Sequence, residues 1–182
     1  QMTSYSQIGQ DRLVVHLTKE KRCGTFVDIG CSRPSLINNT FLLENEYQWT
    51  GLSIDIDEAE KANWEQERPD SPMVIADALK VDFLELFKEH ELSSVIDYLS
   101  FDLEPPEATF EALQRLPFDD YTFNVITYEH DGYRMGDEFK SNTREFLTSK
   151  GYMLIHELNN QDDVYLSQEF FDQHVVEDTT NE

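Results

Sequence analysis

Short apolar runs alternate along the chain with stretches in which apolar residues recur every three or four positions. The runs predict six strands and a short seventh, at residues 25–29, 51–55, 73–76, 95–101, 123–128, 152–155 and 164–166. Helical spacing is clearest at residues 83–87, 110–116 and 139–150, where Gly151 suits a C-terminal cap. Weaker helical patterns cover residues 36–46 and 58–67.

Alternation of strands and helices, with nearly continuous apolar strands, indicates a parallel sheet covered on both faces. The pattern therefore predicts an α/β fold, a Rossmann-like doubly wound and mostly parallel sheet. The last two strands are joined by a short polar turn at residues 159–163, which predicts an antiparallel pair at one edge. With 182 residues we expect a single domain, frayed at residues 1–5 and 177–182.

In such sheets ligands bind outside the carboxyl ends of the strands, so the strand ends are where function is expected. Gly30 ends the first strand, and a lone glycine is also an ordinary turn residue. Asp55 ends the second strand, where a carboxylate can accept the hydroxyls of a ribose, while Asp57 suits the start of the next helix. Asp77 ends the third strand, where its carboxylate could equally well accept a hydrogen bond from an adenine amine or stabilise a turn.

Asp102 and Glu104 end the fourth strand, and Glu129 and His130 end the fifth. Carboxylates and a histidine that converge from neighbouring strands make a general-base cluster or an oxygen-rich metal site, unless they are merely exposed loop residues. We favour His130 as the general base, oriented by a carboxylate and without a metal. The alternative makes the three carboxylates ligands of a divalent cation such as magnesium.

Acidic residues dominate the charge, with 37 Asp and Glu against 14 Lys and Arg. Such a surface repels phosphates, so we expect no nucleic acid partner. No stretch approaches the ~20 apolar residues of a membrane span, so we expect no membrane partner either. Residues 1–10 lack the basic and apolar parts of a signal peptide, and Cys23 and Cys31 are too few for a disulfide framework. We therefore expect a cytoplasmic protein.

Six segments form an ordered set over most of the chain. They are residues 6–11 (SQIGQD), 26–30 (FVDIG), 38–44 (NNTFLLE), 49–55 (WTGLSID), 97–104 (DYLSFDLE) and 126–130 (ITYEH). Their order and spacing resemble those of FkbM-type methyltransferases. The resemblance implies a class I methyltransferase fold with S-adenosylmethionine as cofactor. It implies O-methylation of a small-molecule or sugar-containing (glycan) acceptor.

The same resemblance assigns the cofactor to Asp28, Gly30, Asp55 and Asp77. The sequence departs from the family at residues 31–34 (CSRP), which replace small residues, and at Pro105, which stands in place of a glycine. Two other functions remain open at this stage. A methyltransferase fold can serve as a non-catalytic binding module. A nucleotide-dependent oxidoreductase is disfavoured because Gly30 lacks the further glycines that a dinucleotide requires.

Overall fold

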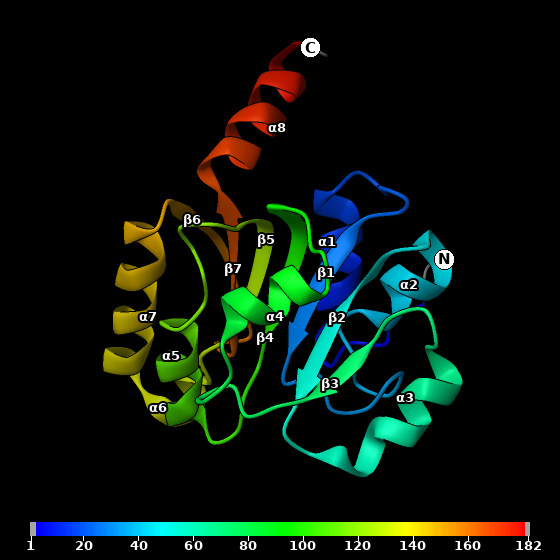
Figure 1. Cartoon of the computed structure of the whole chain (residues 1–182). Coiled ribbons are helices and arrows are strands. Elements are labelled where there is room, and N and C mark those ends of the chain that lie inside the picture. The colour runs from blue at the N-terminus through cyan, green and yellow to red at the C-terminus, as the bar shows by residue number, and fades with distance from the viewer. Residues whose placement is uncertain (1–2, 181–182) are drawn as a thin grey trace.

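The computed structural model describes residues 3–180, with side chains through His174. Seven strands form one sheet in the order β3-β2-β1-β4-β5-β7-β6 (Figure 1). The strands are β1 (Thr25–Ile29), β2 (Thr50–Asp55), β3 (Met73–Ile75), β4 (Val95–Phe101), β5 (Thr122–Glu129), β6 (Tyr152–Leu158) and β7 (Asp162–Ser167). The helices are α1 (Gln10–Leu17), α2 (Phe41–Tyr47), the 3-10 turn η1 (Glu58–Glu60), α3 (Lys61–Glu67), α4 (Phe83–Glu89), α5 (Pro106–Leu113), α6 (Gly132–Met135), α7 (Asp137–Ser149) and α8 (Gln168–Thr180).

Strands β1 to β5 are parallel, and β7 runs antiparallel between β5 and β6. The predicted mostly parallel α/β sheet with an antiparallel pair at one edge is therefore confirmed. The strand order reverses at β1 and β4, which places a crevice beyond their carboxyl ends.

The alternation of side chains along each strand sends apolar residues into two separate cores. In β1, Phe26 joins a core with α1, α2 and the first turn of α8, whereas Val27 and Ile29 join a core with α4, α5 and α7. Both faces of the sheet are thus covered by helices (Figure 1). The distal part of α8 extends away from the sheet.

One predicted helix begins later than the pattern at residues 36–46 suggested. Asn38 Oδ1 accepts the backbone N–H groups of Thr40 and Phe41, and Ile37 has a φ of 52°. Because an asparagine side chain that binds nearby N–H groups favours a turn over a helix, α2 starts only at Phe41. The residues before it form a loop beside the crevice.

Part of each expected frayed end, residues 1–2 and 181–182, lies outside the described residues. Ser4 and Tyr5 are held by the carboxylate of Asp11, which accepts from the Ser4 hydroxyl and the Tyr5 backbone N–H. Cys23 and Cys31 are free, as expected. Within the described chain, no helix has the length and apolar character needed to cross a membrane.

Candidate functional site

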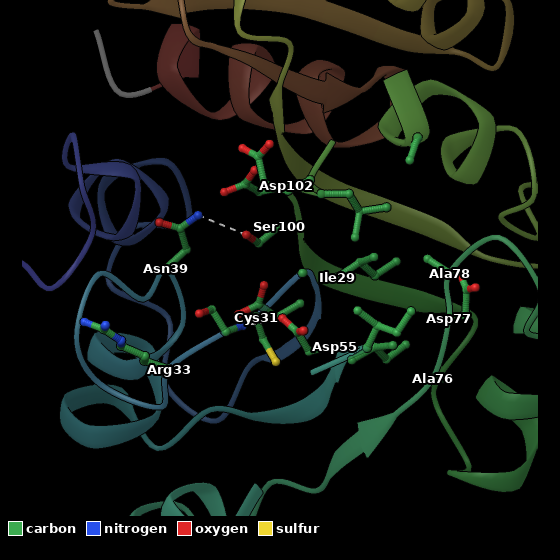
Figure 2. Close-up of a pocket in the computed structure, with 18 of the residues that line it drawn as sticks. Ile29, Cys31, Arg33, Asn39, Asp55, Ala76, Asp77, Ala78, Ser100 and Asp102 are labelled. Carbon is green, nitrogen blue, oxygen red and sulfur yellow. Dashed lines mark hydrogen bonds between the residues drawn. The ribbon is translucent and has the colours of Figure 1, made fainter. Parts of the chain in front are cut away.

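A cavity of about 680 Å³ opens at the carboxyl ends of β1, β2, β3 and β4 (Figure 2). This volume lies within the range of small-molecule sites. Its walls combine aliphatic side chains with several carboxylates. The lining includes Asp28, Ile29, Gly30, Cys31, Leu36, Ile37, Asn39, Ile54, Asp55, Ile56, Ala76, Asp77, Ser100, Asp102, Leu103 and Glu104.

Gly30 forms the tight turn between β1 and the cavity loop. Its φ is 82°, and its N–H donates to the Ile54 carbonyl at 2.8 Å. A Cβ at this position would lie 1.6 Å from the backbone carbonyl oxygen of Asp102. Only glycine fits here, because the turn must adopt a left-handed conformation and also pack directly on the chain leaving β4.

Asp55 is anchored at the end of β2 as a hydrogen-bond acceptor. Its two carboxylate oxygens accept the backbone N–H groups of Ser32, at 2.8 Å, and Asp57, at 2.9 Å. Each oxygen retains a further lone pair that can accept a ligand hydroxyl. Asp57 accepts from the Ala59 N–H and caps η1, which confirms its expected role as the helix-start residue.

Asp28, at the end of β1, lines the cavity and is almost completely buried. Burial raises the pKa of its carboxyl group to about 7, against the opposing charge of Arg68. Among the other lining residues, the side-chain amide of Asn39 donates to the Ser100 hydroxyl at 3.0 Å. This end of the cavity is therefore polar.

Asp77 lies at the other end of the cavity, beside Ala78 (Figure 2). Its Oδ1 accepts the Leu79 N–H at 2.9 Å, and its carbonyl accepts the N–H groups of Lys80 and Val81. The turn role expected for Asp77 is thus present, and the same carboxylate still lines the cavity.

Arg68 shapes the cavity loop, although no sequence pattern singled it out. Its guanidinium is fully buried and donates to the Pro34 carbonyl, the Asn38 Oδ1 and the Thr40 hydroxyl at 2.9–3.1 Å. It also pairs with Glu44 at 2.9 Å. One side chain therefore holds the loop between β1 and α2 against the body of the domain.

Asp102 and Glu129 come together at the ends of β4 and β5, as predicted. The carboxyl of Glu129 lies within hydrogen-bonding reach of those of Asp102 and Asp131. Burial and these neighbouring carboxyl groups raise the pKa of Glu129, and burial raises that of Asp102. Such a pair can hold a shared proton, which is the property of a general base with raised basicity.

Glu104 is near this pair but faces solvent, with 67% of its side chain exposed. It forms an ion pair with Arg134 of α6 at 3.2 Å. Arg134 also pairs with Asp131, so this exposed arginine links the loop after β4 to the loop after β5.

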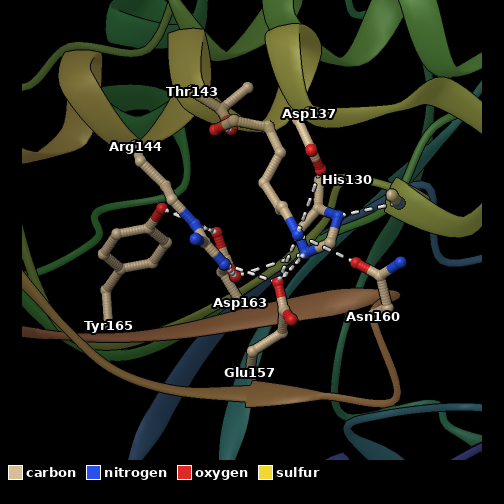
Figure 3. A network of polar contacts seen from close by, with 10 residues as sticks. His130, Asp137, Thr143, Arg144, Glu157, Asn160, Asp163 and Tyr165 are labelled. Carbon is tan, nitrogen blue, oxygen red and sulfur yellow. Dashed lines mark hydrogen bonds and ion pairs between the residues drawn. The ribbon is translucent and has the colours of Figure 1, made fainter.

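His130 does not join Asp102 and Glu104, contrary to the expected four-residue cluster. It is fully buried and does not line the cavity, with Nε2 at 3.2 Å from both Glu157 Oε2 and Asp163 Oδ1 (Figure 3). His130 follows the last residue of β5, and its ring contacts the β6–β7 hairpin, whereas Glu129 contacts Asp102. The structure therefore places His130 in a polar network and not beside Asp102 and Glu104, where it was expected.

His130, Glu157 and Asp163 are the one group of described residues whose ligand atoms cluster as a metal would require, within 4.8 Å. However, His130 Nδ1 accepts the Gly132 N–H at 2.8 Å, so the proton of the neutral ring is on Nε2. Nε2 lies near both carboxylates without a hydrogen bond to either. Arg144 already contacts both of them, and Lys140 contacts Glu157. This group is an ion-pair network that joins β5, α7 and the β6–β7 hairpin.

No protein-family model matches the chain, and no curated protein matches it. Similar solved structures include a putative rRNA methylase from Clostridium thermocellum, with 18% identity, a TM-score of 0.60, and 90% of this chain and 97% of that one covered. M. capricolum TrmK in complex with S-adenosyl-homocysteine shares 14% identity, with a TM-score of 0.54 and coverages of 92% and 70%. The sugar N-methyltransferase KedS8 from Streptoalloteichus shares 12% identity, with a TM-score of 0.57 and coverages of 91% and 89%.

These similarities correct the exclusion of nucleic acid. That expectation rested on a net charge of −23 and is wrong, because the same fold occurs in a putative rRNA methylase. Net charge sums the whole surface, whereas a substrate contacts one part of it. At these identities the similarities show the fold alone: the chain has the Rossmann-like fold of class I methyltransferases.

Proposed function

We propose that this protein is an S-adenosylmethionine-dependent methyltransferase of the FkbM type that methylates a hydroxyl of a small-molecule or sugar-containing acceptor. The observation that carries the proposal is the cavity at the carboxyl ends of β1 and β2, with Asp55 fixed at its wall. The structure of TrmK with S-adenosyl-homocysteine, on the same fold, supports this choice of cofactor.

The residues present fit such a cofactor. Asp55 can accept the ribose hydroxyls, because both of its oxygens are oriented by backbone N–H groups. We assign Asp77 to the adenine end and Asp28 with Gly30 to the methionine end; Asp77 lies across the cavity from Asn39 (Figure 2). The single glycine turn suits a ligand without phosphates.

The bound cofactor would supply an electrophilic methyl group. The acceptor hydroxyl must then approach in line and lose its proton. We assign that proton to the pair Asp102 and Glu129, since Asp102 lines the cavity and burial raises the pKa of both carboxyl groups. Glu104 lies at the rim, where it can contact the acceptor. His130 positions the loop after β5 through its network.

Calorimetric titration with S-adenosyl-homocysteine tests the cofactor placement on a matched pair of variants. Asp55→Asn should weaken binding about tenfold or more, because a hydrogen bond to a charged group contributes ~1.5–3 kcal/mol. Asp57→Asn should bind like wild type, since asparagine also caps a helix and Asp57 does not line the cavity. Equal affinities in the two variants would refute the assignment of the ribose to Asp55.

A further inference from the structure

Two apolar side chains are exposed at the cavity on the loop between β1 and α2. Six large apolar side chains of the described chain are exposed to solvent, and three of these line the cavity: Leu36 (57% exposed), Ile37 (59%) and Ile56. Ile56 directly follows Asp55, so the proposed cofactor accounts for it. We call Leu36 and Ile37 the apolar rim. Single exposed apolar residues are ordinary, whereas a group of them around one cavity indicates a ligand.

The backbone of Ile37 has a conformation that isoleucine rarely adopts. Its φ is 52°, in the left-handed region, where a branched side chain crowds the main chain. Asn38 holds the loop in this shape, because its side-chain amide donates to the carbonyls of Cys31 and Arg33 at 3.3 and 2.8 Å. The backbone N–H of Asn38 also donates to the Tyr5 carbonyl at 2.9 Å. The loop therefore presents an exposed, branched apolar side chain on a strained backbone, and strain of this kind is concentrated at functional sites.

The apolar rim lies on the side of the cavity opposite the adenine end. It is placed in the chain between Arg33 and Asn39, and both of these residues lie across the cavity from Asp77 (Figure 2). The wall beside the rim is polar, because Asn39 donates to the hydroxyl of Ser100 at 3.0 Å. Ser100 is buried, whereas the rim is exposed. A ligand that extends from this wall to the rim would place a polar group inside and an apolar group outside.

Both residues of the apolar rim are aliphatic, which determines the kind of group that gains by contact with them. A group covered with hydroxyls would lose hydrogen bonds to water there without replacing them. An aliphatic group would gain free energy, because the contact removes apolar surface from water on both sides. The rim therefore favours an aliphatic group over a polyhydroxylated one.

We infer that the apolar rim binds an aliphatic or alicyclic group of the acceptor and so positions the acceptor's hydroxyl at the polar wall, beside the methyl group. This inference rests on the proposed function. It narrows the acceptor to a small molecule that carries an aliphatic group next to the hydroxyl that is methylated. Leu36 and Ile37 are then residues that determine acceptor specificity.

Methyl NMR spectra of the protein saturated with S-adenosyl-homocysteine test the inference with two probes that share one carbon ring. Cyclohexanol carries a single hydroxyl on an apolar ring, whereas myo-inositol carries a hydroxyl on every carbon. Cyclohexanol should shift the methyl signals of Leu36 and Ile37 saturably, and myo-inositol should leave them in place, because only the apolar ring gains by contact with the rim. Absence of a shift with cyclohexanol, or equal shifts with both probes, would overturn the inference.

A matched pair of variants extends the test, with the methyl signals of the cavity residue Leu103 as the measure of affinity in each protein. Ile37→Asn should weaken cyclohexanol binding about tenfold, because it removes half of the rim. The same variant should raise the Tm by about 3 °C, since asparagine adopts the left-handed backbone more readily than isoleucine. Val95→Asn, which removes an exposed apolar side chain at the start of β4 and outside the cavity, should retain the wild-type affinity.

Unchanged affinity for cyclohexanol in Ile37→Asn would overturn the inference. A lower Tm in this variant would also overturn it, because Ile37 would then stabilise the fold. Weaker binding of S-adenosyl-homocysteine to Ile37→Asn would assign the rim to the cofactor, with the same consequence. If the wild type does not bind S-adenosyl-homocysteine, the proposed function is refuted. If it binds that ligand and cyclohexanol shifts neither rim signal, only the present inference fails.

Discussion

Arg68→Met is expected to destabilise the domain strongly and to weaken cofactor binding. The guanidinium is fully buried, and its partner Glu44 keeps only 16% of its side chain exposed. Removing one member of a buried pair typically costs about 3–5 kcal/mol, because the other charge is left without compensation. For a chain of this length that corresponds to a fall in Tm of about 10 °C. The loop carbonyl of Pro34 and the side chain of Asn38 also lose their donor.

Thermal unfolding followed by circular dichroism measures this effect, and titration with S-adenosyl-homocysteine measures the loss of loop order. Arg22→Met is the matched control, because Arg22 is exposed and should change the Tm by less than about 2 °C. The double variant Arg68→Met with Glu44→Leu should recover part of the lost stability, since an apolar pair replaces the stranded carboxylate. A wild-type Tm in Arg68→Met would refute the reasoning.

Three further predictions concern charge and burial. Because the folded pKa of Asp28 is raised to about 7, folding binds an extra proton between about pH 4 and 7, so stability should fall as pH rises through this window. The variant Asp28→Asn should therefore have a higher Tm than wild type at pH 8 and a much smaller increase in Tm at pH 5. An equal increase in Tm at the two pH values would contradict this prediction. His130→Ala should lower the Tm, since it strands the Gly132 N–H and the buried Asp163, yet leave the affinity for S-adenosyl-homocysteine unchanged; a large loss of affinity would bring His130 back to the cofactor site. Raising NaCl from low millimolar to about 0.5 M should raise the Tm of the wild type by screening its excess negative charge, and a flat profile would show that the acids are already paired.

The strands could be predicted because each is an apolar run long enough to be buried on both faces, as in residues 95–101. The start of α2 could not, because it depends on which N–H groups the Asn38 side chain binds. The pattern of apolar residues indicates which positions are buried. It does not indicate that the Asn38 side chain binds nearby backbone N–H groups, because that contact forms only in the folded loop.

In the candidate site, too, some residues could be predicted from the sequence and others could not. Asp55 and Asp102 were accessible to prediction because the carboxyl ends of parallel strands share one edge of the sheet. Arg68 was not, since it reaches the cavity loop from the end of α3, about thirty residues later in the sequence. The position of His130 could not be predicted either, because its partners Glu157 and Asp163 belong to the later β6–β7 hairpin.

Calorimetric titration of the wild-type protein with S-adenosyl-homocysteine and, separately, with NAD⁺ tests the central claim most directly. The cavity with one glycine turn and the anchored Asp55 predicts binding of one S-adenosyl-homocysteine per chain and no heat of binding with NAD⁺. No binding of S-adenosyl-homocysteine, or tighter binding of NAD⁺, would contradict the assignment of this protein as a methyltransferase.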